Sequence, residues 1–187
     1  MNFTQIIEAL VAMLRPKAKL PPTAQLPWMA VAHTYLGISE IKGAKHNPDI
    51  VEMFALSGFS GIKDDETPWC AAFVGAVLYL SGLGRRDGIN LAARSFESYG
   101  VGLSEPLYGC VGVKKRAGGA GWQGHVGFVV GANATHIFLL GGNQGDKVSI
   151  ASFKRSEFTA FRWPAGVAKT SIPLPQTIEG AKSATEA

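Results

Sequence analysis

The spacing of apolar residues changes once along the chain, near residue 108. Before that point apolar side chains recur every three or four residues, which is the period of an amphipathic helix. The pattern predicts helices at residues 4–14, 28–36, 48–56, 68–80 and 92–99. The helix at 68–80 is apolar on every face, which is typical of a helix buried in the middle of a domain.

After residue 108 short apolar runs are separated by glycine-rich or polar turns. Such runs predict strands, and a tight turn near Asn133 predicts that two of them form a hairpin. The predicted strands are residues 110–113, 125–130, 135–140, 148–153 and 158–163. Helices followed by antiparallel strands indicate an α+β fold.

The length of 187 residues and a hydrophobic fraction of 47% indicate one globular domain with additions at its ends. We assign residues 1–27 to an N-terminal amphipathic helix and linker, 28–164 to the main domain, and 165–187 to a flexible tail rich in Ala, Thr, Ser and Pro. The N-terminal helix either packs on the main domain, which is the commoner case, or anchors the chain to a membrane or a partner.

The net charge of +4 is too small for a nucleic-acid-binding signature, so no nucleic-acid partner is expected. No segment approaches the ~20 consecutive apolar residues of a membrane span. The first apolar run contains Glu8 and no small-residue cleavage site follows it, so it does not resemble a secretory signal. The sequence therefore predicts a monomer made in the cytoplasm without a signal peptide.

The segment Thr67-Pro68-Trp69-Cys70 has the sequence of a helix start. Thr67 is a suitable N-cap, and Pro68 suits the first helical position. Cys70 then lies in the first turn, where the positive end of the helix dipole lowers the pKa of a cysteine. A free cysteine is also commonly a small buried hydrophobe, and this segment alone leaves both interpretations open. A disulfide to the second cysteine, Cys110, is possible, but a chain of this size does not need one.

A thiol nucleophile needs a base, and the chain has four histidines. His125 begins the first strand of the predicted hairpin, directly after a glycine-rich loop. His33 and His46 have no orienting motif near them. His136 falls about five residues, or roughly 17 Å, along the hairpin from His125. His125 is therefore the predicted base.

The group that orients this base follows from the register of the hairpin. A turn of two to four residues places the partner of His125 between residues 140 and 142. Asn143 is then a cross-strand neighbour whose amide oxygen holds the imidazole and sets its tautomer. Gln144 points to the opposite face, unless Gly141-Gly142 forms a bulge that exchanges the two residues.

Cys70 as nucleophile, His125 as base and Asn143 as orienting group follow the Cys-His-Asn logic of papain-like enzymes. The motifs resemble those of the bacterial and phage cell-wall cysteine hydrolases of the NlpC and CHAP type. Residues 68–73, 124–129 and 142–144 carry this resemblance, and residues 36–40 and 46–48 resemble a phage-associated subgroup. The resemblance implies a papain-like fold over residues 28–164, with the nucleophile at a helix start packed on an antiparallel sheet.

The resemblance also implies an activity, which is hydrolysis of peptidoglycan without a cofactor. The bond would be an amide of the stem peptide or the amide between muramic acid and L-alanine. The absence of a signal peptide suits an endolysin released by a holin, or an effector injected into another cell. Three alternatives stay open: an interbacterial effector amidase with a cognate immunity protein, a non-catalytic wall-binding module, and a cysteine acyltransferase on the same fold.

Four further residues are candidates for substrate binding: Trp69, Trp122, Glu40 and Gln144. Trp122 ends the glycine-rich loop, so it is either an anchor that pins the loop to the core or a lid that covers the substrate. We adopt the lid as our hypothesis. Acidic residues 64–66 could line the cleft or serve as caps. They lack the spacing of a calcium loop, no cluster has zinc-site spacing, and no metal is expected.

Overall fold

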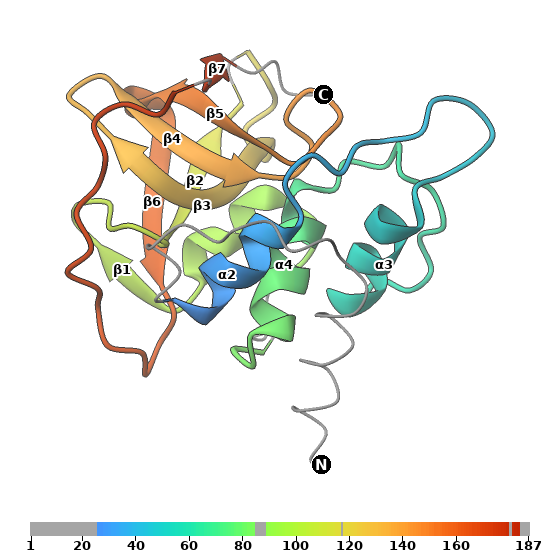
Figure 1. Ribbon diagram of the computed structural model, residues 1–187, viewed down its shortest axis with the longest axis horizontal. Coiled ribbons are helices and arrows are strands. Elements are labelled where there is room, and N and C mark those ends of the chain that lie inside the picture. The colour runs from blue at the N-terminus through green and yellow to red at the C-terminus, as the bar shows by residue number, and fades with distance from the viewer. Residues whose placement is uncertain (1–25, 85–88, 117, 180, 184–187) are drawn as a thin grey trace.

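The computed structural model describes residues 26–84, 89–116, 118–179 and 181–183. The helix predicted at residues 4–14 and most of the predicted linker lie outside these ranges. The described chain is a mixed α+β structure, as predicted, with helices on one side of a seven-stranded sheet (Figure 1). The strand order is β1-β6-β2-β3-β4-β5-β7, and every neighbouring pair is antiparallel except β5 and β7.

The elements have the following bounds. The helices are α2 (Pro27–Thr34), α3 (Pro48–Leu56) and α4 (Cys70–Leu80), with 3-10 turns η1 (Ala93–Ser98) and η2 (Arg155–Glu157). The strands are β1 (Val101–Leu103), β2 (Val111–Lys115), β3 (Gly124–Ala132), β4 (His136–Gly141), β5 (Ser149–Lys154), β6 (Phe158–Trp163) and β7 (Lys182–Ser183). The sequence pattern missed β1 and β7, because two or three residues are too short to show a period.

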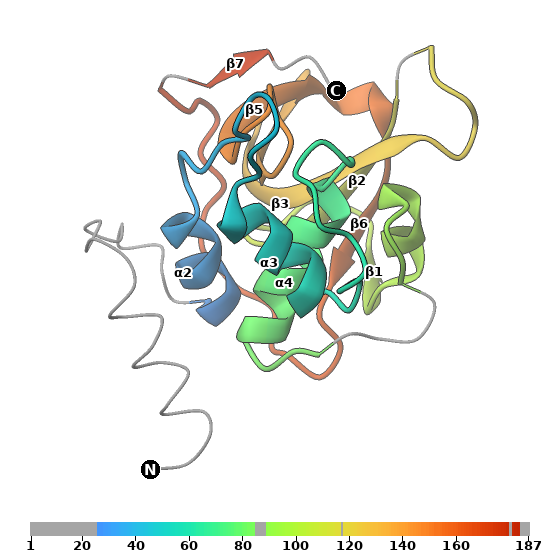
Figure 2. The ribbon, with the colours of Figure 1, turned by 90° about the vertical axis from the view of Figure 1, so that its right-hand side faces the viewer.

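Helix α4 is the centre of the helical layer (Figures 1 and 2). Nine of its eleven residues are buried, which agrees with its apolar sequence on every face. The ring of Phe73 makes edge contacts with Tyr35 after α2 and with Phe128 on β3, at centroid distances of 6.0 and 6.1 Å. A Cβ added at Gly75 would lie 2.8 Å from Cβ of Ser57, so a glycine lets α3 and α4 approach closely.

The two predicted helix starts have different outcomes. The start at Asn47 is confirmed, because its side-chain oxygen accepts the backbone N–H of Asp49 at 2.9 Å. The start at Thr67 is wrong, since α4 begins at Cys70 with Trp69 as a cap residue that makes no side-chain capping bond. Thr67 instead donates its backbone N–H to the carboxylate of Asp64 at 2.7 Å, which closes a turn before the helix. Cys70 is therefore the first residue of α4.

The predicted register of the β3–β4 hairpin is also wrong. Phe128 pairs with Leu140 and Ala132 with Ile137, with an irregularity between Val129 and Gly131. The residues of the turn are held by Asn133, whose side-chain oxygen accepts the backbone N–H groups of Thr135 and His136. The turn is centred later in the chain than predicted, which moves each predicted partner, and β4 ends at Gly141 before it reaches a position opposite His125.

His136 was predicted to lie opposite residue 130, and it lies elsewhere. It is at the turn end of β4, where its carbonyl accepts the backbone N–H of Asn133 and its strand partner is Lys154. His136 thus lies beside the last residues of β3, whereas His125 is the second residue of that strand. His136 is therefore outside the site, as predicted.

The segment after Pro164, expected to be a flexible tail, makes defined contacts in its described part. Its backbone carbonyls accept hydrogen bonds from the indole of Trp163 (at Val167), from the backbone of Ala132 (at Pro175) and from the side chain of Asn133 (at Gln176). The segment then reaches β7, which extends the sheet beyond β5. Among the described residues, no helix combines the length and the apolar composition of a membrane span.

Candidate active site

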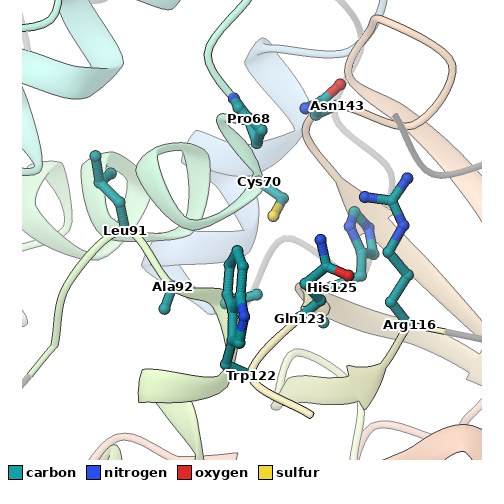
Figure 3. Close-up of a pocket in the computed structure, with 11 residues that line it drawn as sticks. Pro68, Cys70, Leu91, Ala92, Arg116, Trp122, Gln123, His125 and Asn143 are labelled. Carbon is teal, nitrogen blue, oxygen red and sulfur yellow. The ribbon is translucent and has the colours of Figure 1, made fainter. Parts of the chain in front are cut away.

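Cys70 lies at the mouth of a pocket formed by the start of α4, the start of β3 and the loops beside them (Figure 3). Its side chain is 7% exposed. The residues that line the pocket are Pro68, Cys70, Leu91, Ala92, Ala93, Arg116, Trp122, Gln123, Gly124, His125 and Asn143. The pocket thus contains the three residues that the sequence analysis assigned to catalysis.

His125, the second residue of β3, shares this pocket with Cys70. Its ring is 3% exposed and packs against the ring of Phe153 on β5, at a centroid distance of 5.3 Å. Lys114, which is the strand partner of His125, places its Nζ 4.8 Å from the Phe153 centroid. Nζ also lies 3.3 Å from the Glu157 carboxylate. These contacts fix the plane of the imidazole.

Gln144 orients the imidazole. Its Oε1 lies 3.1 Å from Nε2 of His125. Its own amide nitrogen donates to the backbone carbonyls of Ser149 at 2.6 Å and Leu139 at 3.3 Å, so the oxygen is the end that faces the ring. An amide oxygen only accepts, and therefore His125 donates from Nε2 and keeps Nδ1 as the acceptor nitrogen of the neutral ring.

The structure corrects the roles predicted for Asn143 and Gln144. Strand β4 ends at Gly141, and Asn143 follows in the left-handed region with a φ of 56°, which turns Gln144 toward His125. A Cβ added at Gly141 would lie 2.9 Å from Oε1 of Gln144 and 3.3 Å from Nε2 of His125. The two amides are therefore exchanged, as the sequence analysis allowed, but through the end of β4 and the turn at Asn143 and not through a bulge, and Gly141 leaves room for the contact.

Asn143 nonetheless lies in the pocket. Its side chain is 5% exposed, and its Oδ1 has no hydrogen-bond partner among the described residues. No hydrogen bond joins it to the imidazole among the described residues, and the orienting contact predicted for Asn143 is made by Gln144 instead.

Trp69 and Glu40 do not line the pocket. They contact each other next to it. Trp69 is fully buried and donates its indole N–H to the Glu40 carboxylate at 2.7 Å, so neither ring face is open to a substrate. Partial burial raises the pKa of Glu40, and the bond from Trp69 opposes that rise. A Cβ added at Gly142 would lie 2.5 Å from Cζ3 of Trp69, which shows that the indole packs directly under the turn that carries Asn143.

Trp122 is the opposite case, because 69% of its surface is exposed. The loop that carries it is held by Gln123, whose side-chain and backbone atoms bond Ala120 at 2.8 Å each, and by the Arg94 guanidinium, which donates to the carbonyl of Gly121. The indole itself stands at the rim of the pocket (Figure 3). An exposed tryptophan does not anchor a loop, so the anchor interpretation is wrong and the lid hypothesis stays a prediction.

Asp65 is structural. It is fully buried and accepts the backbone N–H groups of Ile41 at 2.9 Å and Asn47 at 2.8 Å, and Nδ1 of His46 at 3.0 Å. Burial acts to raise the pKa of this carboxyl, but the hydrogen bonds outweigh it and the pKa is lowered. Asp65 therefore fixes the loop before α3 and does not belong to the cleft, although the sequence analysis had placed it there as an option.

Cys110, unlike Cys70, does not line the pocket. It is fully buried, and burial raises the pKa of its thiol to about 12. Neither cysteine forms a disulfide. Within the described ranges, no three His, Cys, Asp or Glu side chains gather as a set of metal ligands.

Sequence reasoning missed Phe153, Lys114 and Ser149 as supports of His125 and Gln144. They come from strands whose register with β3 and β4 carries no local signal, because pairing is decided by tertiary packing. Arg116 also lines the pocket.

Comparison of the chain with models of protein families, with curated proteins and with solved structures finds no match. The function is therefore argued from the geometry of the site and from the motifs of the sequence.

Proposed function

We propose that the protein is a cysteine hydrolase that cleaves an amide bond of peptidoglycan, with Cys70 as nucleophile, His125 as base and Gln144 as the group that orients the base. One observation carries this proposal: Gln144 Oε1 lies 3.1 Å from Nε2 of His125, in a pocket that Cys70 and His125 line together. A histidine whose tautomer is set in this way beside a cysteine is the arrangement that thiol hydrolases need.

The proposed reaction follows from the atoms in the pocket. Nδ1 of His125 takes the proton of Cys70, and the sulfur attacks the carbonyl carbon of the substrate amide. The carbon–sulfur bond forms while the electron pair of the carbonyl moves to oxygen. When that pair returns, the carbon–nitrogen bond breaks and His125 gives its proton to the leaving amine. Water, deprotonated by the same histidine, then bonds to the carbonyl carbon of the thioester, the carbon–sulfur bond breaks, and His125 returns the proton to the sulfur.

The position of Cys70 at the start of α4 supports a nucleophilic role. The first N–H groups of a helix have no partner within the helix and carry the positive end of its dipole. Both features stabilise negative charge, first on the thiolate and then on the oxygen of the tetrahedral intermediate. The cap residue, Trp69, makes no side-chain capping bond at this helix start.

The assignment of substrate rests on the resemblance in residues 68–73, 124–129 and 142–144 to cell-wall hydrolases of the NlpC and CHAP type. The order of elements supports it: a cysteine at a helix start, a histidine on the next long strand and an amide after the following strand, as in papain-like enzymes. The exposed rim residue Trp122 suits a polymeric substrate, because an aromatic face packs on peptide and sugar alike.

The test is digestion of purified peptidoglycan, with mass analysis of the soluble fragments. Wild type should release fragments whose new amine and carboxyl ends identify the bond. Cys70→Ala should release none, and Cys110→Ser, which removes the buried thiol, should release the same fragments as wild type. Folding of each variant is checked by circular dichroism. A folded Cys70→Ala variant that still digests the wall would refute the proposal.

A further inference from the structure

Asn143 combines two features that each cost stability. Its φ of 56° lies in the left-handed region, which a side chain with a Cβ adopts at an energetic cost. Its Oδ1 is buried and has no hydrogen-bond partner in the described part of the chain. Both occur at a residue that lines the pocket with Cys70 and His125. Buried polar groups without partners and strained backbone gather at functional sites, so this residue needs a chemical explanation.

The neighbouring amide provides the contrast. Gln144 has its nitrogen engaged by two backbone carbonyls and its oxygen engaged by His125. Among the described residues, the buried Oδ1 of Asn143 has no partner, and Nδ2 is not among the buried atoms that lack one. In Figure 3 this nitrogen lies on the side of Pro68, and the oxygen points away from Cys70. The donor end of the amide thus remains for a ligand in the pocket.

We propose that the Asn143 side chain is an oxyanion donor of this site, acting together with the backbone N–H of Cys70. This inference rests on the proposed thiol hydrolysis. When the sulfur of Cys70 bonds to the carbonyl carbon, the carbonyl electron pair becomes an alkoxide on oxygen. Nδ2 of Asn143 donates one hydrogen bond to that oxygen, and the first N–H of α4 donates another. The pair returns to carbon as the carbon–nitrogen bond breaks, and both hydrogen bonds then weaken.

The donor is held in place before the reaction, which is the condition for electrostatic catalysis. The turn packs on the buried ring of Trp69 at Gly142, on one side of Asn143. On the other side the backbone N–H of Gln144 donates to the carbonyl of Lys147 at 3.0 Å. A residue in a turn fixed on both sides needs no reorganisation when charge develops.

Two variants separate this function from a structural one. Asn143→Gly removes the amide and suits a positive φ, and Asn143→Asp keeps the shape but removes the donor. Each should lower kcat for peptidoglycan digestion by about 10²- to 10³-fold, the usual effect of removing one oxyanion donor, with little change in KM. Alkylation of Cys70 by iodoacetamide forms no oxyanion, so its rate in the Gly variant should match that of wild type.

The outcomes distinguish this inference from the proposed function. Full kcat in both variants would overturn the inference while leaving the hydrolase intact. A parallel fall of hydrolysis and of alkylation in the Gly variant would also overturn it, since Asn143 would then act through the Cys70–His125 pair. Hydrolysis of 4-nitrophenyl acetate, which passes through the same oxyanion, repeats the comparison without peptidoglycan. If wild type cleaves only this ester and Asn143→Gly slows it, the substrate assignment fails and the oxyanion donor stands.

Discussion

The two cysteines of this chain lie in opposite environments. Cys70 is the first residue of a helix and opens on a pocket that also contains a histidine. Cys110 lies before β2, fully buried, where burial raises the pKa of its thiol to about 12. The proposed function therefore gives the same side chain two roles, a nucleophile that lines a pocket in one place and an inert apolar group in the other. The expected difference in reactivity comes from the helix start, the imidazole and the pocket at Cys70. Substitutions around Cys70 test these contributions one at a time.

Removal of the imidazole should have the largest effect. We expect His125→Ala to lower peptidoglycan hydrolysis by about 10⁴-fold or more, as loss of Cys70 does, because nucleophile and base act as a unit. The double variant Cys70→Ala with His125→Ala should be no worse than either single one. Fragment release measured with all three proteins checks this, with His136→Ala as the control histidine. Additive losses would show that the two residues act independently.

Removal of the orienting amide should have an intermediate effect. Gln144→Ala frees the imidazole to rotate. We expect hydrolysis to fall by about 10²-fold, which is less than for loss of the imidazole, because the base is still present but is no longer held in position. Alkylation of Cys70 should slow as well, because the tautomer is no longer set. Initial rates of both reactions are compared with those of Gln176→Ala, a glutamine remote from the pocket. Unchanged alkylation in Gln144→Ala would mean that Gln144 does not act on His125.

The contrast between Asn143 and Gln144 also shows how far the sequence determines the site. The sequence placed Cys70 near a helix start and His125 near a strand start, and the structure brings both into one pocket, since such starts have local signals. The choice between the two amides could not be made from the sequence, because it depends on where β4 ends and on a positive φ at Asn143. Sheet register is decided by turn length and packing, and a change of one residue moves a side chain to the other face.

The elements of the fold, too, were predicted correctly where the sequence carries a local signal and missed where it does not. The helix at residues 48–56 and the strand at 158–163 were predicted correctly, since Asn47-Pro48 is a strong cap signal and the strand has dense aromatic residues. The helix at 68–80 was started two residues early, because Thr67 has the chemistry of a cap but its backbone is used in the turn with Asp64. The described tail lacks periodicity, and its contacts with β3 and the hairpin turn depend on backbone carbonyls that every residue has.

Two tryptophans sharpen the comparison between accessible and buried groups. Trp122→Ala removes a side chain at the pocket rim, and we expect activity on polymeric peptidoglycan to fall by about 10-fold, equivalent to ~1.4 kcal/mol of aromatic contact. The melting temperature should stay nearly constant. Trp69→Ala, which empties a fully buried site, should instead lower the melting temperature by about 6 °C or more. A large loss of stability in Trp122→Ala would contradict the lid hypothesis.

The smallest effect on activity is expected at Asp65, which is remote from the pocket lining. The folded-state pKa of this carboxyl is lowered, so it contributes stability that is present above the unfolded pKa of about 3.9 and is lost as pH falls through the folded value. Asp65→Asn should lower the free energy of unfolding at pH 7 and flatten its decline below about pH 4. Urea titrations across pH check this, and an unchanged pH profile would contradict the structural assignment.

The most direct test of the site is the rate at which each thiol reacts in the native protein. We expect iodoacetamide at pH 7 to label Cys70, and to leave Cys110 unlabelled until the protein is unfolded, because a thiol of pKa about 12 has only about 10⁻⁵ of its population as thiolate. Peptide mass spectrometry over time gives both rates, and His125→Ala should slow the labelling of Cys70 alone. Equal labelling of the two cysteines, or a Cys70 that reacts no faster in wild type than in His125→Ala, would contradict an activated nucleophile at the start of α4.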